Sequence, residues 1–542
     1  MAVATTRSVA LRGSEGHLVE VQVDVSQGMV GTSLVGRAGA SLSEAKDRVR
    51  MAVSNACPPW PASRRVTILL SPADLPKAGS HYDLAIAVAA KAAALRAGAC
   101  QDEERGGKQA QIPQEALVET AFIGELALSG ALRAVPGVLP MVLAASAAGV
   151  RRVFVPETQA SEAALVPGMT VFGVRSLAQV VAELRGEEVP DAPPIATQQP
   201  ARLLTWRGDS ARDFVDMADV EGLVDTKYAV EVAAAGGHHL MLAGPRGAGK
   251  TTLAERIPTI LPDLDVEQAL EVTAIHSLAG ALGESRSLLR RPPFLAPHHD
   301  ASKASIIGGG SGVVRPGAVS QAHHGVLFLD EFPLMRSDVV DALREPLESG
   351  EVTIARGEDT ATFPAKGMVV LAANPCPCGN HHPLARGTCE CPEVARRRYR
   401  TKLSGPMADR VDIWRQVDPQ EPAAGRDGTA RAEGSEAIRA RVATARERQA
   451  VRYAERRWRL NGAVPGPALT ADYPLASAGR DLLEAQLAEG ALTRRGVTRV
   501  HRVAWTVADL AGVERPGRDE VDVALRLRTG QPLPVRTLGV IR

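Results

Sequence analysis

Aromatic residues make up only 3% of this chain of 542 residues. Cysteines and long apolar runs are also scarce, and each of these two scarcities excludes a class of protein. Six cysteines are too few for the disulfide scaffold of a small secreted domain. No run of roughly 18 apolar residues is present, so no membrane-spanning helix is expected. The N-terminus MAVATTRSVALRG also lacks the apolar centre of a signal peptide. We therefore expect a cytoplasmic protein without a membrane partner.

An excess of charge of one sign is also missing. The chain has 63 basic and 62 acidic residues, so its formal net charge is +1. Proteins that bind nucleic acid over much of their surface are usually strongly basic, so a polyanion site here must be a local patch. At this length one apolar core does not suffice, and we expect roughly two or three domains.

The chain divides at two polar stretches. Residues 185–213 and 421–434 lack an apolar period and are predicted to be linkers. Residues 1–184 alternate short strand candidates with alanine-rich helix candidates, and residues 214–420 contain strand–loop–helix units. Residues 435–542 have mostly helical periodicity. The predicted fold class is α/β in the first two domains, followed by a helical C-terminal domain.

A glycine-rich loop follows the short apolar stretch HLMLA at 239–243. Residues 244–251 read GPRGAGKT and match the pattern G-x-x-x-x-G-K-[ST], whose backbone N–H groups cradle phosphate oxygens. Lys250 is predicted to reach the β and γ phosphates of ATP, and Thr251 to ligate Mg²⁺. The predicted nucleotide-binding residues are Gly244, Pro245, Arg246, Gly247, Ala248, Gly249, Lys250, Thr251 and Thr252.

A second motif favours an ATPase over a chance match in a glycine-rich chain. Val326–Glu331 reads VLFLDE, a buried strand that ends in two carboxylates. Asp330 is predicted to hold Mg²⁺ through water, and Glu331 to orient and polarise the attacking water. A further strand, Met368–Ala373, ends at Asn374. The amide of Asn374 can contact the γ phosphate or its water, and the alternative is that it caps a turn.

Four of the six cysteines fall within sixteen residues. They form two C-x-C pairs, namely Cys376 with Cys378 and Cys389 with Cys391. Four thiolates on two turns can enclose a structural Zn²⁺, and His381 or His382 could replace one of them. The alternatives are reduced thiols on a turn or a redox disulfide.

The segments DMADVEGLVDTKYAVEVAAAGGHHLMLAGPRGAGKT, PFLAPHH, GGGSGVVRPGAVSQAHHGVLFLDE, LAANPCPCG and LSGPMADRVDI occur in this order along the chain. Together they resemble the magnesium-chelatase-like AAA+ ATPases of the ComM (YifB) type. The resemblance implies a central AAA+ domain, a helical lid, and a ring, as a hexamer, that translocates DNA and promotes branch migration during natural transformation. The alternatives are a motor that inserts Mg²⁺ into a porphyrin and a protein-remodelling chaperone.

The same resemblance assigns roles to single residues. Asn374 would be the sensor at the γ phosphate, and Arg410 would be the arginine finger of a neighbouring subunit's site. Without the resemblance, an ion pair of Arg410 with Asp409 or Asp412 is the simpler interpretation.

The resemblance extends to the C-terminal helical lid, but the segment PFLAPHH departs from the family's pattern at one residue. Arg499 would be the nucleotide-sensing arginine of the lid, with Arg495 and Arg502 as alternatives. The family's PFRAPHH segment reads PFLAPHH here, so Leu295 replaces an arginine, and any role of that arginine is absent.

Residues 1–184 resemble the Lon-type protease domain, which has an S5-like α/β fold. The segments PKAGSHYDLAIA and GELALSGALRAVPGVLPMVLAA parallel those that carry its catalytic serine and lysine. Here His81 takes the serine position and Leu139 the lysine position, while Ser80 lies next to the first. A Ser–Lys dyad is therefore absent, and we expect an assembly or docking module.

Two arginine-rich segments are candidates for contacting DNA phosphates, Arg396–Lys402 and Arg446–Arg459. The alternative for both is a solvated helix face paired with nearby acids. Residues 351–366 are predicted to form a hairpin that lines the pore of the ring in similar helicases, with Arg356 and Lys366 as candidate contacts.

Overall fold

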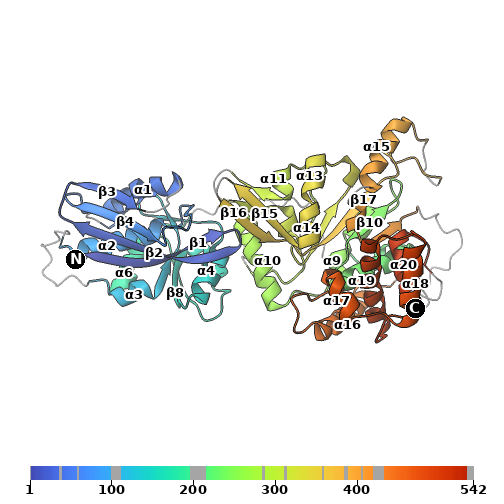
Figure 1. The fold of residues 1–542 in the computed structure, drawn as a ribbon. Helices are drawn as coiled ribbons and strands as arrows, with labels where there is room; N and C mark the ends of the chain where they lie inside the picture. The colour runs from blue at the N-terminus through green and yellow to red at the C-terminus, as the bar shows by residue number, and fades with distance from the viewer. Residues whose placement is uncertain are drawn as a thin grey trace.

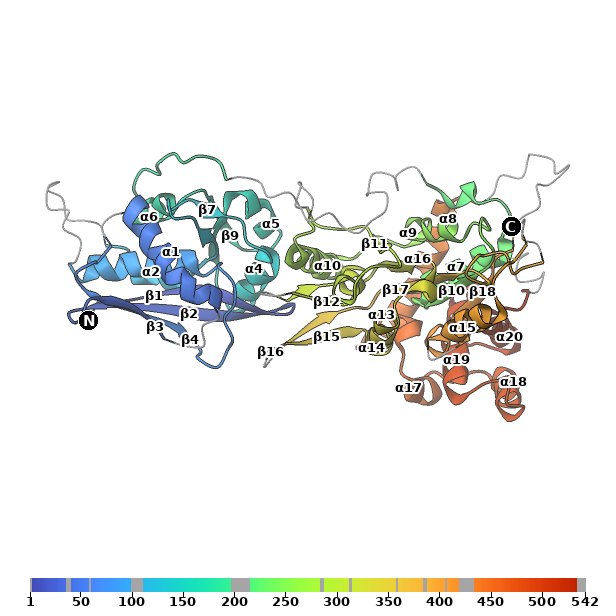
Figure 2. The same ribbon diagram turned by 90° about the horizontal axis from the view of Figure 1, so that it is seen from above.

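Three parts of the chain follow one another in space, as Figures 1 and 2 show: an N-terminal sheet with its helices, a central sheet, and a group of C-terminal helices. The structure is a computed structural model that describes residues 2–35, 40–57, 60–98, 111–195, 215–282, 287–310, 314–356, 359–383, 388–404, 407–418 and 433–533. Most of both predicted linkers therefore lies outside the described residues, and the domain boundaries stay a prediction.

The N-terminal part is built on a mixed seven-stranded sheet. From one edge to the other its strands are β3 (Gly31–Val35), β4 (Arg65–Ser71), β2 (Glu15–Ser26), β1 (Val3–Arg12), β5 (Thr120–Phe122), β8 (Arg152–Pro156) and β9 (Thr170–Val174). β1 and β2 form an antiparallel hairpin, whereas β1, β5, β8 and β9 run parallel. The short strands β6 (Glu125–Leu126) and β7 (Leu132–Arg133) form a separate hairpin.

Helices cover both faces of this sheet, because alternate side chains of each strand point to opposite faces. Ala4 and Ala10 of β1 belong to one apolar cluster and Val9 to another. The first cluster includes residues of α1 (Ala40–Ala56), α2 (Asp83–Arg96), α3 (Gln114–Val118) and α6 (Leu177–Arg185). The second includes residues of α4 (Val138–Ala147) and α5 (Ala160–Ala163).

The central part contains a five-stranded sheet in which all neighbouring strands are parallel. In spatial order the strands are β11 (Phe294–Leu295), β14 (Val326–Leu329), β17 (Met368–Ala373), β10 (Leu240–Ala243) and β18 (Ile413–Gln416). Every residue of β14 and β17 is buried, as is typical of strands that are covered on both faces. The carboxyl ends of the strands meet at one edge, where ligands bind in open α/β sheets.

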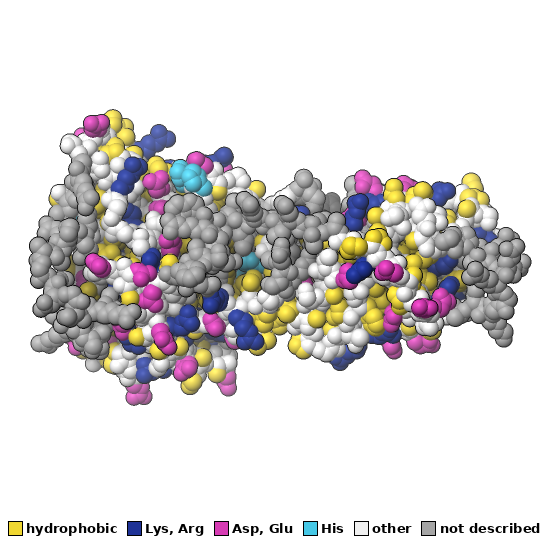
Figure 3. Space-filling view, turned by 180° about the vertical axis from the view of Figure 1, so that it is seen from behind, with side chains coloured by type: hydrophobic (Ala, Val, Ile, Leu, Met, Phe, Trp, Pro, Cys, Tyr) yellow, Lys and Arg dark blue, Asp and Glu magenta, His cyan; other side chains and the backbone are white. Residues whose placement is uncertain are grey.

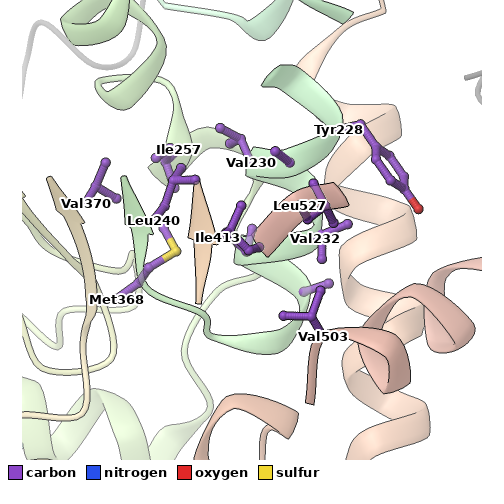
Figure 4. Close-up of a cluster of buried hydrophobic side chains, with 14 of the residues drawn as sticks. Tyr228, Val230, Val232, Leu240, Ile257, Met368, Val370, Ile413, Val503 and Leu527 are labelled. Carbon is purple, nitrogen blue, oxygen red and sulfur yellow. The ribbon is translucent and has the colours of Figure 1, made fainter. Parts of the chain in front are cut away.

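One face of the central sheet packs against the C-terminal helices. In Figure 4, Leu240, Val370 and Ile413 of three strands point into the same cluster as Val503 and Leu527 of two helices. The helices on this face are α7 (Val224–Gly236), α8 (Lys250–Ala254), α9 (Ile257–Ile260), α16 (Ser435–Arg452), α18 (Ser477–Ala488), α19 (Arg494–Ala511) and α20 (Arg518–Thr529). α17 (Gly466–Ala471) contributes to a smaller cluster with α19.

The other face packs against short helices and a hairpin. The helices are α11 (Lys303–Ile306), α12 (Ala318–Gln321), α13 (Ser337–Ala342) and α14 (Arg344–Ser349). The predicted hairpin is confirmed as β15 (Glu351–Arg356) and β16 (Asp359–Pro364), and β12 (Gly308–Gly309) pairs with β13 (Arg315–Pro316). Leu295, which replaces the family's arginine, is a core residue of this face and is 1% exposed.

The predicted fold class is confirmed, with a mixed α/β N-terminal part, a parallel central sheet and a helical C-terminal part. Among the described residues, no helix combines the length and the apolarity that crossing a bilayer requires.

The N-terminal part contacts the central part through a helix and the β15–β16 hairpin. Ser277, near the end of α10 (Val266–Ala279), donates a hydrogen bond of 2.5 Å to the buried carboxylate of Glu162. The backbone N–H of Ser14 donates to the carbonyl of Thr362 at 3.4 Å, so the turn between β1 and β2 lies against the outer edge of β16. Figure 2 shows the hairpin reaching toward the N-terminal sheet.

Candidate functional site

The predicted phosphate loop lies at the carboxyl edge of the central sheet, directly after β10. Gly247 and Gly249 have φ of +76° and +90°, a backbone conformation that residues with a side chain rarely adopt. A Cβ on Gly244 would lie 2.1 Å from the carbonyl oxygen of Val417, so only glycine fits beside β18. α8 begins at Lys250, and its positive end therefore faces the loop.

Lys250 is largely buried within the loop. Its ammonium group donates to the carbonyl oxygens of Gly244 and Pro245 at 2.6 and 2.8 Å, and to Oδ1 of Asn374 at 3.0 Å. Burial lowers the pKa of Lys250 to about 8, although the carboxylates of Asp330 and Glu331 favour its charged form. The end of β17, at Asn374, and the phosphate loop therefore meet at the ammonium group of Lys250.

Thr251 and Asp330 fit a magnesium site. Thr251 Oγ1 donates to Asp330 Oδ2 at 2.9 Å. Neighbouring oxygen ligands in an octahedral Mg²⁺ shell with bonds of about 2.1 Å lie roughly 3 Å apart. These two residues would hold the ion, which would supply positive charge beside the phosphate groups of ATP.

Glu331 has an unusual backbone conformation. Its φ is +48°, and only two other non-glycine residues in the described part of the chain, Leu223 and His324, have positive φ. A left-handed conformation costs about 1–2 kcal/mol for a residue with a side chain. The N–H of Glu331 donates to Oδ1 of Asp330 at 2.8 Å, which helps to hold the turn. Strain of this kind clusters at functional sites.

Three polar groups surround the Glu331 carboxylate. Asn374 Nδ2 donates to Oε1 at 3.4 Å, and Arg246 Nη2 lies 3.8 Å from the same oxygen. On the other side His299 Nδ1 lies 3.7 Å from Oε2. The carboxylate is therefore held between the end of β17, the phosphate loop and the segment after β11.

The sequence did not single out His299. It follows the two-residue strand β11, which is too short to recognise by periodicity. Because β11 pairs in parallel with β14, the segment after it emerges beside Asp330 and Glu331. The available signal was the pair of histidines in PFLAPHH, which precedes the acidic motif.

The four clustered cysteines converge on one point. Their sulfur atoms all lie within 4.8 Å of one another. Cys376 Sγ is 3.3 Å from Cys378 Sγ and 3.7 Å from Cys389 Sγ. Sulfur ligands in a tetrahedral zinc site with bonds of about 2.3 Å lie roughly 3.8 Å apart, so the arrangement fits structural zinc.

The two histidines of the cysteine loop have other partners. Nδ1 of His381 lies 2.9 Å from a guanidinium nitrogen of Arg396, and Nε2 of His382 lies 3.2 Å from the amide of Gln416. The four cysteines are therefore the better ligand set.

The cysteine loop also touches the nucleotide site. Gly379 has a φ of +83°, and a Cβ there would lie 2.7 Å from Cγ of Arg246 in the phosphate loop. Zinc at the four sulfurs would stabilise the loop that leads from Asn374 to this contact.

Comparison with known protein families gives one match in each of the N-terminal, central and C-terminal parts. The family described as "Subunit ChlI of Mg-chelatase" matches residues 21–159, "Magnesium chelatase, subunit ChlI" matches 216–424, and "Magnesium chelatase, subunit ChlI C-terminal" matches 432–528. The competence protein ComM of Haemophilus influenzae is 36% identical over 530 residues, which are 97% of this chain and 98% of that protein. The chain belongs to the ComM/YifB family of magnesium-chelatase-like proteins.

Two further relatives match over comparable lengths. YifB of Escherichia coli is 35% identical over 538 residues, 99% of this chain and 98% of that protein. An uncharacterized protein of Mycobacterium tuberculosis, Rv2897c, is 46% identical over 528 residues, 97% of this chain and 99% of that protein. The family places the phosphate loop and the acidic strand in a ComM-like AAA+ domain.

The predicted finger of this ComM/YifB-family chain, Arg410, lies before β18, at the amino edge of the sheet. Its guanidinium forms an ion pair of 2.8 Å with Glu348, not with Asp409 or Asp412, and its side chain is 12% exposed. The phosphate loop lies at the opposite edge, so Arg410 does not reach the nucleotide site of its own chain. The contribution of Arg410 to another subunit's site stays a prediction.

The predicted sensor of the lid, Arg499, lies at the same amino edge. It forms an ion pair of 2.5 Å with buried Asp412. Burial alone would raise the pKa of Asp412, but Arg499 and His238 hold it well below its usual range. Asp412 also accepts the backbone N–H of His239, which precedes β10, whereas the phosphate loop follows this strand. Arg499 therefore lies away from the phosphate loop of its own chain, and its role as the nucleotide-sensing arginine of the lid stays a prediction.

The two alternative lid arginines have partners outside the phosphate loop. Arg495 is exposed and lies 3.9 Å from Glu348, beside Arg410. Arg502 donates to the carbonyl of Val464 at 2.8 Å.

The residues at the protease-like positions have structural partners. Nε2 of His81 lies 2.8 Å from the carbonyl oxygen of Val9, and burial lowers the pKa of His81 to about 4. Ser80 donates to the carboxylate of Glu125. Leu139 belongs to α4 and is buried in the apolar cluster on one face of the N-terminal sheet. His81 and Leu139 stand where the serine and the lysine of the dyad would be, and both are packed within the fold.

The two candidate DNA-binding segments differ in the structure. In Arg446–Arg459 most guanidinium groups have partners within the chain: Arg446 is bonded to Ala234, Arg448 and Arg452 to Asp509, Arg456 to Asp472, and Arg459 to Asp265 and Glu267. α16 ends at Arg452, so the second half of this segment lies outside the helix. This segment is therefore mainly structural, and its prediction as a phosphate-binding patch is not supported.

The second segment, Arg396–Lys402, lies on α15 (Glu393–Ser404), and several of its arginines are exposed. On the face drawn in Figure 3, basic and acidic side chains are interspersed, in agreement with the net charge. Of the two residues predicted to line a pore, Lys366 is exposed just after β16, and the side chain of Arg356 lies outside the described residues.

Proposed function

We propose that this ComM/YifB-family chain is a ring-forming AAA+ ATPase that translocates DNA and promotes branch migration when incoming DNA recombines during natural transformation. The ATPase part rests on the convergence of Lys250, Asn374 and Glu331, with Thr251 and Asp330 beside them. The DNA part rests on the relative whose name is competence protein ComM and on exposed arginines of α15.

In the proposed reaction, the chain's own groups position a water molecule and neutralise charge. Lys250 and the N–H groups of the phosphate loop hold the triphosphate, and Mg²⁺ at Thr251 and Asp330 supplies further positive charge. Glu331 takes up a proton from the attacking water, and Asn374 orients the carboxylate and the γ phosphate. Arg410 of an adjacent subunit completes the charge stabilisation, which explains why a ring, as a hexamer, is part of the proposal.

The N-terminal domain is proposed to dock, not to cleave proteins. The residues that stand at the dyad positions, His81 and Leu139, are buried and bonded or packed within the fold. The contact of Glu162 with Ser277 gives this domain a fixed place against the central part.

The proposal is tested with the purified chain and its Glu331→Gln variant. ATP turnover is measured with Mg²⁺, with and without single-stranded and forked DNA. We expect turnover that DNA stimulates in the wild type, and a loss of at least about 100-fold in the variant, because the water loses its base. ATP binding should be unchanged. Stimulation only by a protein or a porphyrin partner would instead favour the remodelling or the chelatase alternative.

A further inference from the structure

α15 has two faces with different surroundings. It contains five basic residues and one acidic residue, Glu393, in its first turn. Positions three and four residues apart share a face of a helix. The outward face holds Val394, Arg397, Arg398 and Thr401, all exposed, whereas Tyr399 on the opposite face is 5% exposed. Figure 1 shows α15 at the far end of the central part from the N-terminal sheet.

The inward face of α15 is attached to both loops that carry the predicted catalytic residues. The hydroxyl oxygen of Tyr399 accepts the backbone N–H of Asn374 at 3.3 Å. Nζ of Lys402 donates to the carbonyl of Met335 at 3.0 Å, in the segment that follows Glu331. A displacement of α15 would therefore move the ends of β17 and β14 together.

The outward face has the charge of a phosphate-binding surface. Neither Arg397 nor Arg398 forms an ion pair with a described residue. Lys402 and Arg396, by contrast, are bonded inward. Arginine forks match the geometry of phosphate oxygens, and unpaired arginines lose no internal partner on binding. The phosphate backbone of a nucleic-acid strand has the complementary charge.

We propose that the outward face of α15 binds the phosphate backbone of single-stranded DNA through Arg397 and Arg398. Tyr399 and Lys402 then transmit this binding to the nucleotide site, so that DNA contact repositions Asn374 and Glu331 and raises the rate of hydrolysis. The inference rests on the proposed DNA-dependent ATPase and names the surface that senses the DNA.

The binding step is tested with a fluorescein-labelled single-stranded oligonucleotide and the full-length protein. Fluorescence anisotropy gives the affinity at several salt concentrations for the wild type and for Arg397→Ala/Arg398→Ala. We expect weaker binding, and a plot of log affinity against log salt whose slope is smaller by about 1 for each lost contact. Arg480→Ala/Arg518→Ala removes the same charge from exposed positions on α18 and α20 and should bind as the wild type does.

The transmission step is tested with Tyr399→Phe, which keeps the ring and removes only the hydroxyl group. The oligonucleotide affinity should match that of the wild type, while the ratio of ATP turnover with DNA to turnover without DNA should fall at least about two-fold. Lys402→Met should act in the same direction. A purely structural role of Tyr399 would lower turnover equally with and without DNA.

Two outcomes overturn the inference in distinguishable ways. If the wild type binds DNA and Arg397→Ala/Arg398→Ala binds it equally well, the α15 surface is wrong while the DNA-dependent ATPase stands. If the wild type hydrolyses ATP but neither binds DNA nor responds to it, both the inference and the proposed DNA function are wrong.

Discussion

At the scale of single residues, the environment of Glu331 is the most informative feature. A carboxylate that polarises water must be aimed, and a left-handed backbone with contacts on both oxygens provides this aim. Asn374 was expected from its place at the end of a strand. His299 was not, because nothing local marks it as a partner of an acid 32 positions further along the chain.

His299→Ala is expected to lower kcat for ATP about ten-fold, because Glu331 loses the group beside Oε2 and its carboxylate can rotate away. KM should change little, since no contact of His299 with the phosphate loop is involved. Steady-state ATPase measurements check both values. His298→Ala is the matched control, because this neighbouring imidazole pairs with Asp300 at the surface. Equal effects of the two variants would contradict the positioning role.

At the scale of elements, the cysteine loop and α15 form one connection between β17 and β18. The loop begins two residues after Asn374, touches Arg246 at Gly379 and leads into α15. It contains no long apolar segment that could hold it in place. Four sulfur ligands at tetrahedral spacing would replace the missing core, as structural zinc does in small domains.

Purified protein is expected to contain close to one zinc per chain, measured by atomic spectroscopy. Cys389→Ser should lose the metal, and ATP affinity should fall because Gly379 no longer supports Arg246. Cys57→Ser removes a cysteine that lies outside the cluster and should keep both zinc and affinity. Wild-type protein that contains no zinc after purification without chelators would contradict the assignment.

At the scale of the whole molecule, the N-terminal part is held against the central part by an apolar junction. Leu11 of β1, Leu278 of α10 and Phe363 of β16 share one apolar cluster. Gly137 lies beside this cluster with a φ of +78°, and a Cβ there would lie 2.8 Å from side-chain atoms of both Leu11 and Leu278. The junction therefore depends on close approach, not only on hydrogen bonds.

Gly137→Leu is expected to loosen the junction. Hydrogen exchange of α10 and β16 should speed up, because a side chain cannot fit between the two leucines. Gly149→Leu is the matched control, since Gly149 has a φ of +84° at the other end of α4 but no heavy atom within 4 Å of its Cβ position. Both variants place a side chain on a backbone with positive φ. Because only the side chain at position 137 meets Leu11 and Leu278, only Gly137→Leu should speed up exchange at the junction. Unchanged exchange in α10 would contradict the docking role.

The sequence by itself determined the order of the parts, the α/β class and the nucleotide site, because these depend on local pattern. A phosphate loop and an acidic strand end need only their own residues to be recognised, and parallel strands then bring their ends together. The tertiary structure alone decided the features that depend on distant partners. It placed His299 beside Glu331, paired Arg499 with Asp412 and Arg410 with Glu348, and neutralised most of Arg446–Arg459 within the fold. A charge in a sequence has no assigned partner until the chain folds, and for that reason local patterns could not predict these pairings.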